Sequence, residues 1–123
     1  MTSTGQSAIL RIDPGARAGG VVVHHGIAHF TTIPDRPFQA GDSVAEQTRQ
    51  ILARVDERLA SLRSTKSCIL TTQIWLSSMD NFTEMNEVWD ASIDPENPPS
   101  RACCAVVLGN PILKVEMLMT AAV

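Results

Sequence analysis

The sequence predicts an α+β fold in which two helices cover one face of a mixed β-sheet. Two observations favour this class. Runs of alternating or continuous apolar residues occupy both ends of the chain and one stretch in the middle, and the two stretches between them have helical apolar spacing. The 123 residues, 44 % of them hydrophobic, suffice for a single core. No linker or repeat interrupts them, so residues 1–123 are expected to form one domain.

The N-terminal third is expected to hold three strands. Residues 8–12 form a short alternating strand, and residues 21–33 form two strands broken near Gly26. The segments 13–20 and 34–42 contain glycine and proline and have no periodicity, so we expect both to be loops.

The first helix is expected to begin after Ser43. Serine is a good N-cap, and Glu46, three residues on, completes a capping box. A helical apolar stripe of about five turns follows; it consists of Val44, Ile51, Leu52, Val55, Leu59 and Leu62. The other side of the helix would carry mostly Gln47, Arg49, Arg54, Asp56 and Arg58.

A strand over residues 67–77 and a second helix come next. β-Branched and aromatic residues predict the strand; one face would carry Ile69, Thr71, Gln73 and Trp75, and the other Leu70, Thr72, Ile74 and Leu76. Asp80 is a good N-cap for the second helix. Its inward side would carry Phe82, Met85, Val88 and Trp89, and the segment 94–100 ends it.

Two C-terminal strands are predicted, over residues 101–108 and 112–123, with a "GNP" turn between them. Paired as a hairpin, they allow two registers. A three-residue loop places Cys104 opposite Glu116 and turns Arg101 to the other face, whereas a four-residue loop places Cys103 opposite Glu116, with Arg101 on the same face as the glutamate. Several strands are apolar on both faces, so we expect the uncovered face of the sheet to meet another copy of the chain.

The composition excludes some classes of partner. The net charge is −3 and the ten Lys and Arg residues are scattered, so no binding to nucleic acid or to an anionic membrane is expected. No apolar run approaches the ~18 residues of a membrane span. The N-terminus does not resemble a signal peptide, and the three cysteines contain no CxxC pair, so a cytoplasmic protein with free thiols is expected.

Arg101 and Glu116 are the candidate catalytic residues, and each has two interpretations. Arg101 stands where an uncharged run begins; it either clamps a ligand carboxylate with its planar fork or pairs with a neighbouring acid. Glu116 is the only acid in residues 110–123, and Lys114 could neutralise it. Apolar surroundings raise the pKa of a carboxyl and suit it to proton transfer. The alternative is an edge-strand acid that points to water.

Other polar residues carry weaker signals. Cys103 shares a strand face with Arg101, but no motif places a base beside it, so a small apolar filler is expected. Asn86 interrupts a helix, either for a polar contact or on a solvated face. No metal site is expected, because no acid or cysteine completes a ligand set with His24, His25 and His29, although His25 and His29 would share a strand face.

The segment "NPPSRACCAVV…LKVEMLMTAA" resembles the C-terminal signature of the RidA family, also called YjgF. "AEQTRQILARVDERLAS" is similar to the family's first helix. "SCILTTQIWLSSMDNFTEMNEVWD" is similar to its central strand and second helix, and "VHHGIAHFTTIP" to its N-terminal hairpin. The match covers residues 8 to 122, and the chain looks closest to the YoaB-like branch.

The resemblance implies a chorismate-mutase-like fold and a homotrimer with ligand clefts between subunits. The family reaction hydrolyses reactive enamines and imines such as 2-aminoacrylate to 2-keto acids and ammonia, without a cofactor. By that likeness Arg101 would clamp the substrate carboxylate and Glu116 would activate water. Cys103 would line the site, mainly through its backbone, and Asn86 would line the cleft.

The chain also departs from the family pattern. It has no tyrosine, although the family motif carries one near the N-terminus, and "FTTIP" replaces the Ser-Gly-Gln-x-Pro segment, so Thr31 or Thr32 would supply the hydroxyl. A second reading is therefore a non-catalytic protein that binds a small carboxylate such as a 2-keto acid. An endoribonuclease fits less well, because the charge is negative and aromatics are only 4 %.

Overall fold

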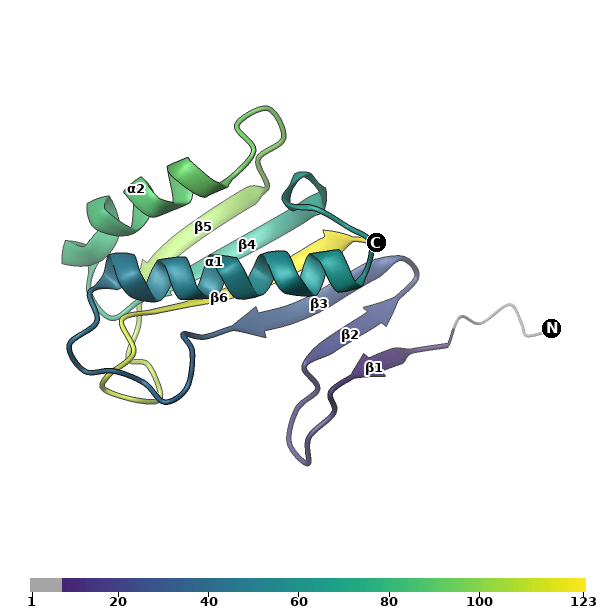
Figure 1. Ribbon diagram of the computed structural model, residues 1–123, viewed down its shortest axis with the longest axis horizontal. Helices are drawn as coiled ribbons and strands as arrows, with labels where there is room; N and C mark the ends of the chain where they lie inside the picture. The colour runs from purple at the N-terminus through teal and green to yellow at the C-terminus, as the bar shows by residue number, and fades with distance from the viewer. Residues whose placement is uncertain (1–7) are drawn as a thin grey trace.

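The computed structural model describes residues 8–123, and Figure 1 shows two helices on one face of a β-sheet, as the sequence predicts. The strands are β1 (Leu10–Ile12), β2 (Val21–His24), β3 (Ile27–Thr32), β4 (Ile69–Leu76), β5 (Ser100–Ala105) and β6 (Val115–Ala122). The helices are α1 (Val44–Ser61) and α2 (Phe82–Ser92), with short 3-10 turns at Lys66–Cys68 and Met79–Asn81. The β1–β2 hairpin extends beyond the area that the helices cover.

The sheet has the order β1-β2-β3-β6-β4-β5, which corrects the predicted C-terminal hairpin. β6 does not pair with β5. It lies between β3 and β4, antiparallel to both, whereas β5 pairs in parallel with β4. Glu116 therefore lies opposite Trp75, and neither Cys103 nor Cys104 is its partner. The long apolar strand β6 takes a central place in the sheet, and residues 106–114 carry the chain past β4 to reach it.

A β-bulge in β4 changes one predicted face. The register shifts between Ile69 and Thr71, so that Ile69 and Thr72 are both buried on the helix side and Leu70 is exposed. From Thr71 to Leu76 the predicted alternation is confirmed. The extra residue of a bulge explains why simple alternation fails at the start of the strand.

The predicted cap of α1 is confirmed, and the predicted cap of α2 is wrong. Ser43 Oγ accepts a hydrogen bond from the Glu46 N–H at 3.1 Å. Asp80 does not cap α2. It lies inside the 3-10 turn that leads into the helix, and its N–H donates to Ser78 Oγ at 3.1 Å. Asn81 holds the N-cap position, but its side chain makes no capping hydrogen bond to the helix.

Gln47 departs from its predicted place on the polar side of α1, because it is 1 % exposed. Its Nε2 donates to the Ile112 carbonyl at 3.0 Å, and its Oε1 accepts from the Lys114 N–H at 2.8 Å. One amide thus ties α1 to the segment that enters β6 and satisfies two backbone groups there.

Replacing Gln47 with leucine is expected to lower the free energy of unfolding by about 2–4 kcal/mol, because a buried backbone donor and acceptor both lose their partner. Urea denaturation at fixed protein concentration measures the change. Gln39→Leu is the control, since Gln39 is exposed and makes one 3.3 Å bond to Pro37; it should change stability by less than about 0.5 kcal/mol. Equal effects of the two substitutions would contradict the role of Gln47.

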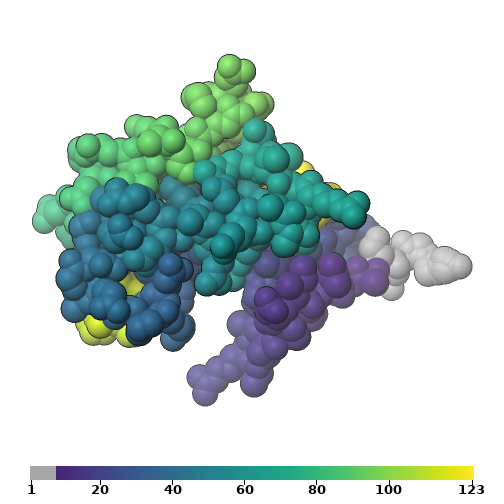
Figure 2. All heavy atoms as spheres, viewed as in Figure 1, coloured from purple at the N-terminus to yellow at the C-terminus, as the bar shows by residue number. Residues whose placement is uncertain are grey.

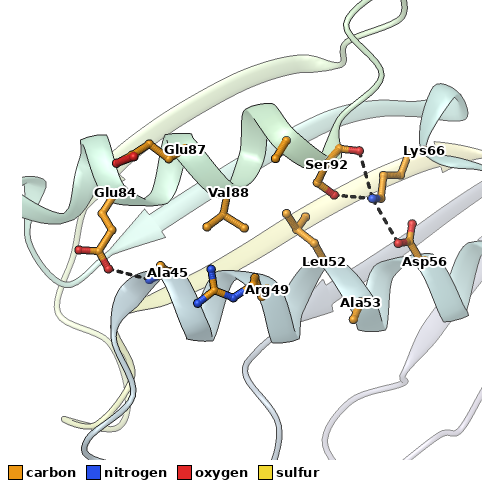
Figure 3. Close-up of a pocket in the computed structure, with 11 residues that line it drawn as sticks. Ala45, Arg49, Leu52, Ala53, Asp56, Lys66, Glu84, Glu87, Val88 and Ser92 are labelled. Carbon is orange, nitrogen blue, oxygen red and sulfur yellow. Dashed lines mark hydrogen bonds and ion pairs between the residues drawn. The ribbon is translucent and has the colours of Figure 1, made fainter.

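The two helices pack side by side and are joined at both ends of a shallow groove of about 590 Å³, drawn in Figure 3. At one end the Ala45 N–H donates to Glu84 Oε2 at 3.1 Å. At the other end Lys66 Nζ donates to the Ser92 carbonyl at 3.1 Å and pairs with Asp56 at 3.2 Å. These contacts fix α2 along the sheet, and α2 carries one wall of the candidate site.

Candidate functional site

Arg101 and Asn86, both predicted site residues, are in direct contact. Arg101 is the second residue of β5, and its Nη1 donates to Asn86 Oδ1 on α2 at 2.8 Å. The guanidinium carbon lies 5.3 Å from the centre of the Trp89 ring and 6.0 Å from that of Phe82. Within residues 8–123 no carboxylate pairs with Arg101, and the residue is exposed. The guanidinium is thus held in place while most of its donors face solvent.

The aromatic contacts of Arg101 did not enter the sequence prediction, although a signal for them exists. Phe82, Asn86 and Trp89 follow the spacing i, i+4 and i+7, which puts all three on one side of a helix. That side faces β5, so one helix supplies both the hydrogen bond and the two rings that hold the arginine.

Cys103 lies on the same face of β5 as Arg101, as predicted, and packs against the core. Burial raises the pKa of its thiol, and the positive charge of Arg101 offsets only part of this effect. A thiol with a raised pKa is a poor nucleophile at neutral pH, so the side chain acts as a small apolar group.

The backbone of Cys103 is better placed than its side chain to meet a ligand. β5 is the last strand of the sheet, and the Val106 N–H donates to the Leu76 carbonyl at 2.9 Å. Because alternate residues of a strand direct their N–H and C=O groups to opposite sides, those of Arg101 and Cys103 point away from β4, toward the free edge. The guanidinium and these backbone groups border the same edge.

Glu116 lies on the other face of the sheet, the one that the helices leave open. It is half-buried beside its partner Trp75, and burial raises the pKa of its carboxyl. No side chain among residues 8–123 donates a hydrogen bond to it. Lys114 was expected to neutralise it, but the Lys114 ammonium instead donates a hydrogen bond to the Asp42 carbonyl.

The raised pKa predicts a stability effect. The neutral form of Glu116 is favoured in the folded state, so this group's contribution is fully present below the ordinary glutamate pKa and is lost as the pH rises through the raised value. Glu116→Gln is therefore expected to have a higher Tm than the wild type at pH 7.5, with the difference shrinking toward pH 4.

Thermal unfolding at one protein concentration tests this expectation. Glu57→Gln is the control, because the Glu57 side chain is 77 % exposed; its effect on Tm should change little with pH. A Glu116→Gln variant no more stable than the wild type at pH 7.5 would contradict the burial effect.

Arg101 and Glu116 cannot meet across one small ligand in a single chain. Glu116, Trp75 and Cys104 form a row of paired residues on the open face. Arg101 and Cys103 alternate with that row, so their side chains lie on the helix face. The full thickness of the sheet separates the two candidate catalytic groups.

Thr31 and Thr32 also lie on different faces. Thr31 is exposed on the open face. It lies opposite Leu118, which is two residues from Glu116 along β6 and therefore on the same face. Thr32 is 2 % exposed on the helix face. Arg58 Nη1 donates to the Thr31 carbonyl at 2.8 Å and to Thr32 Oγ1 at 2.9 Å. Of the two hydroxyls, that of Thr31 shares a face with Glu116.

The three histidines are arranged differently from the prediction. His25 does not share a strand face with His29, because it lies in the β2–β3 turn with φ of 52°. Its ring makes an edge contact with that of His24, with centres 4.0 Å apart. No group of three or more His, Cys, Asp or Glu side chains within residues 8–123 could hold a metal ion.

Comparisons with known proteins show the family of this chain. The family model described as endoribonuclease L-PSP matches residues 13–123. A RutC family protein of Haemophilus influenzae is 38 % identical, with 92 % of this chain and 97 % of the relative covered. The RutC family protein YoaB of Escherichia coli is 36 % identical, with 94 % and 98 % covered.

A solved structure has the same fold. The crystal structure of a YjgF family member from Neisseria meningitidis superposes with a TM-score of 0.87 at 33 % identity, covering 94 % of each chain. Within residues 8–123 no helix is long and apolar enough to cross a bilayer. The chain belongs to the RidA family, also called YjgF or RutC, and fits its YoaB-like branch.

Proposed function

We propose that this protein is an enamine/imine deaminase that hydrolyses 2-imino and 2-enamino acids, such as 2-aminoacrylate, to 2-keto acids and ammonia without a cofactor. The observation that carries the proposal is the exposed guanidinium of Arg101, which Asn86 and Trp89 hold without a carboxylate partner of its own. Such a group is ready to bind the carboxylate of a ligand through a bidentate pair.

The reaction needs one water and one proton relay. Arg101 fixes the substrate carboxylate, and the backbone of Cys103 borders the same edge. Glu116 takes a proton from water as the water oxygen bonds to the imine carbon, and it returns that proton to the nitrogen. It then transfers the proton of the new hydroxyl group to the amine in the same way, so that the C=O bond forms as the C–N bond breaks and ammonia leaves. An enamine first tautomerises to the imine. A carboxyl whose pKa is raised by burial is suited to accept and return this proton.

The two groups belong to opposite faces, so the site is proposed to form between subunits of a homotrimer. Glu116 and Thr31 of one copy would face the β5 edge and Arg101 of the next. Two observations support an interface here. The open face carries the apolar side chains of Trp75 and Leu118, and Val107, just beyond β5, is fully exposed.

The cytoplasm is the proposed compartment. Cys68, Cys103 and Cys104 are all free thiols. Unpaired cysteines fit a reducing environment. Imines and enamines of amino acids also arise inside the cell, from pyridoxal-phosphate enzymes.

Two other functions can be distinguished from the deaminase by experiment. A non-catalytic binder of 2-keto acids would keep Arg101 and lack turnover, and the missing tyrosine and the "FTTIP" segment favour it. An endoribonuclease takes its support from the description of the matching family model, but the net charge of −3 argues against RNA binding.

A coupled assay tests the proposal. An amino-acid oxidase or a serine/threonine dehydratase generates the imine or enamine in place, and semicarbazide traps what has not been hydrolysed. Accelerated loss of the trapped species supports the deaminase. No acceleration on a broad amino-acid panel, combined with saturable 2-keto acid binding, would identify the binder. RNA cleavage that survives in the absence of imine turnover would identify the nuclease.

A further inference from the structure

A second pocket lies at the end of β3, where the chain turns toward α1. In the sheet, β6 and β4 separate β3 from β5, the strand that carries Arg101. It has a volume of about 620 Å³ and is lined by the end of β3, the loop that follows and α1; Figure 2 shows the surface hollowed beside α1 and this loop. Its apolar lining comes from both sides, with Ile33 and Pro34 on the loop and Ala53 on α1. A space of this size holds a small metabolite.

The pocket has an excess of positive charge. Three guanidinium groups line it, those of Arg36, Arg54 and Arg58, against the two carboxylates of Asp35 and Glu57. Arg54 contacts these carboxylates only loosely, at 3.9 Å and 3.6 Å, which is too far for a hydrogen bond. Its fork is therefore free to bind a better acceptor.

Arg58 also has unused donors. Its Nη1 is engaged by Thr31 and Thr32, while its Nε and Nη2 donate to no residue of the described chain. The group is half-buried. Burial and the charge of Arg54 lower its pKa, and the carboxylate of Asp13 offsets only part of this effect. A bound anion between the two arginines would relieve this repulsion.

The wall opposite α1 is held in place. The Asp35 N–H donates to Gln50 Oε1 at 3.0 Å, and Gln50 Nε2 donates to Asp42 Oδ2 at 3.0 Å. The loop that carries Arg36 is thereby tied to α1 at a fixed distance. A site whose walls are already ordered loses little entropy when a ligand binds.

We propose that this pocket binds the phosphate group of a small metabolite, with Arg54 and Arg58 as the main ligands and Arg36 at the rim. A phosphate has more oxygens and a larger negative charge than a carboxylate, so it can receive bidentate forks from two arginines in different directions. The pocket is larger than a phosphate ion, and its apolar lining can contact an organic group attached to the phosphate. The proposal does not depend on the deaminase activity.

Isothermal titration calorimetry of the intact protein at constant ionic strength tests the site. The probes are inorganic phosphate, ribose 5-phosphate, AMP and acetate. We expect saturable binding of the phosphate compounds with a Kd of about 1 mM or below, tighter for the organic phosphates than for inorganic phosphate. Acetate is also a ligand for the carboxylate site proposed at Arg101, so any acetate binding should be unchanged in Arg54→Gln.

Two variants locate the binding. Arg54→Gln is expected to weaken it about tenfold or more, a loss of one charged pair. Arg49→Gln is the control, because Arg49 lies on the same helix but lines the α1–α2 groove; its effect should stay within about twofold. Absence of saturable phosphate binding, acetate binding that Arg54→Gln weakens to the same extent, or equal effects of the two variants would each overturn the site.

Discussion

Arg101→Ala is expected to lower imine hydrolysis by about a hundredfold or more while leaving the fold intact. Loss of a bidentate charged contact to a substrate carboxylate costs about 3 kcal/mol of transition-state stabilisation, which corresponds to that factor. The structural cost is small, because Arg101 is exposed and gives up one hydrogen bond to Asn86 and its contacts with two rings.

Arg101→Lys separates charge from geometry. Lysine keeps the positive charge but lacks the fork that reaches both Asn86 and a carboxylate, so an intermediate loss of about tenfold is expected. Arg49→Ala serves as the control, since Arg49 is an exposed arginine with one ion pair at 3.4 Å. The semicarbazide assay and a circular-dichroism melt are measured on all three variants. If the activity of Arg101→Ala is within twofold of that of the wild type, Arg101 does not bind the substrate carboxylate.

Local features of the fold were predictable because local residues determine them. Ser43 caps α1 through the Glu46 N–H, and the two residues are only three positions apart in the sequence. Gly26 marks the β2–β3 turn for the same reason, with its φ of 76°. The poor helix propensity of Asn86 left two possibilities, a polar contact and a solvated face, and its hydrogen bond with Arg101 is the polar contact.

Long-range features were not predictable in the same way. The central place of β6 depends on pairing with β3 and β4, which are distant in sequence, and a tight turn before β6 favoured the wrong hairpin. The same error hid the geometry of the site. In the hairpin the relative faces of Arg101 and Glu116 depended on loop length, whereas in the sheet the intervening strand β4 fixes them on opposite faces.

That opposite placement makes the strongest prediction about assembly. If each site takes Arg101 from one subunit and Glu116 from the next, the Arg101→Ala and Glu116→Gln variants are each inactive but complementary. Loss of the general base alone lowers turnover by about 10²- to 10⁴-fold. In a randomly mixed trimer of equal amounts, about one interface in four combines an intact arginine with an intact glutamate.

Unfolding the two variants together and refolding them should therefore restore about a quarter of wild-type activity. Each variant refolded alone controls for recovery of the fold, and the two folded proteins mixed without unfolding control for spontaneous exchange of subunits. A mixture as inactive as its components, with mixed trimers verified by native mass spectrometry, would show that no site spans the interface. Because the sheet itself separates the two side chains, that outcome would also exclude Glu116 as the base acting on a carboxylate held by Arg101.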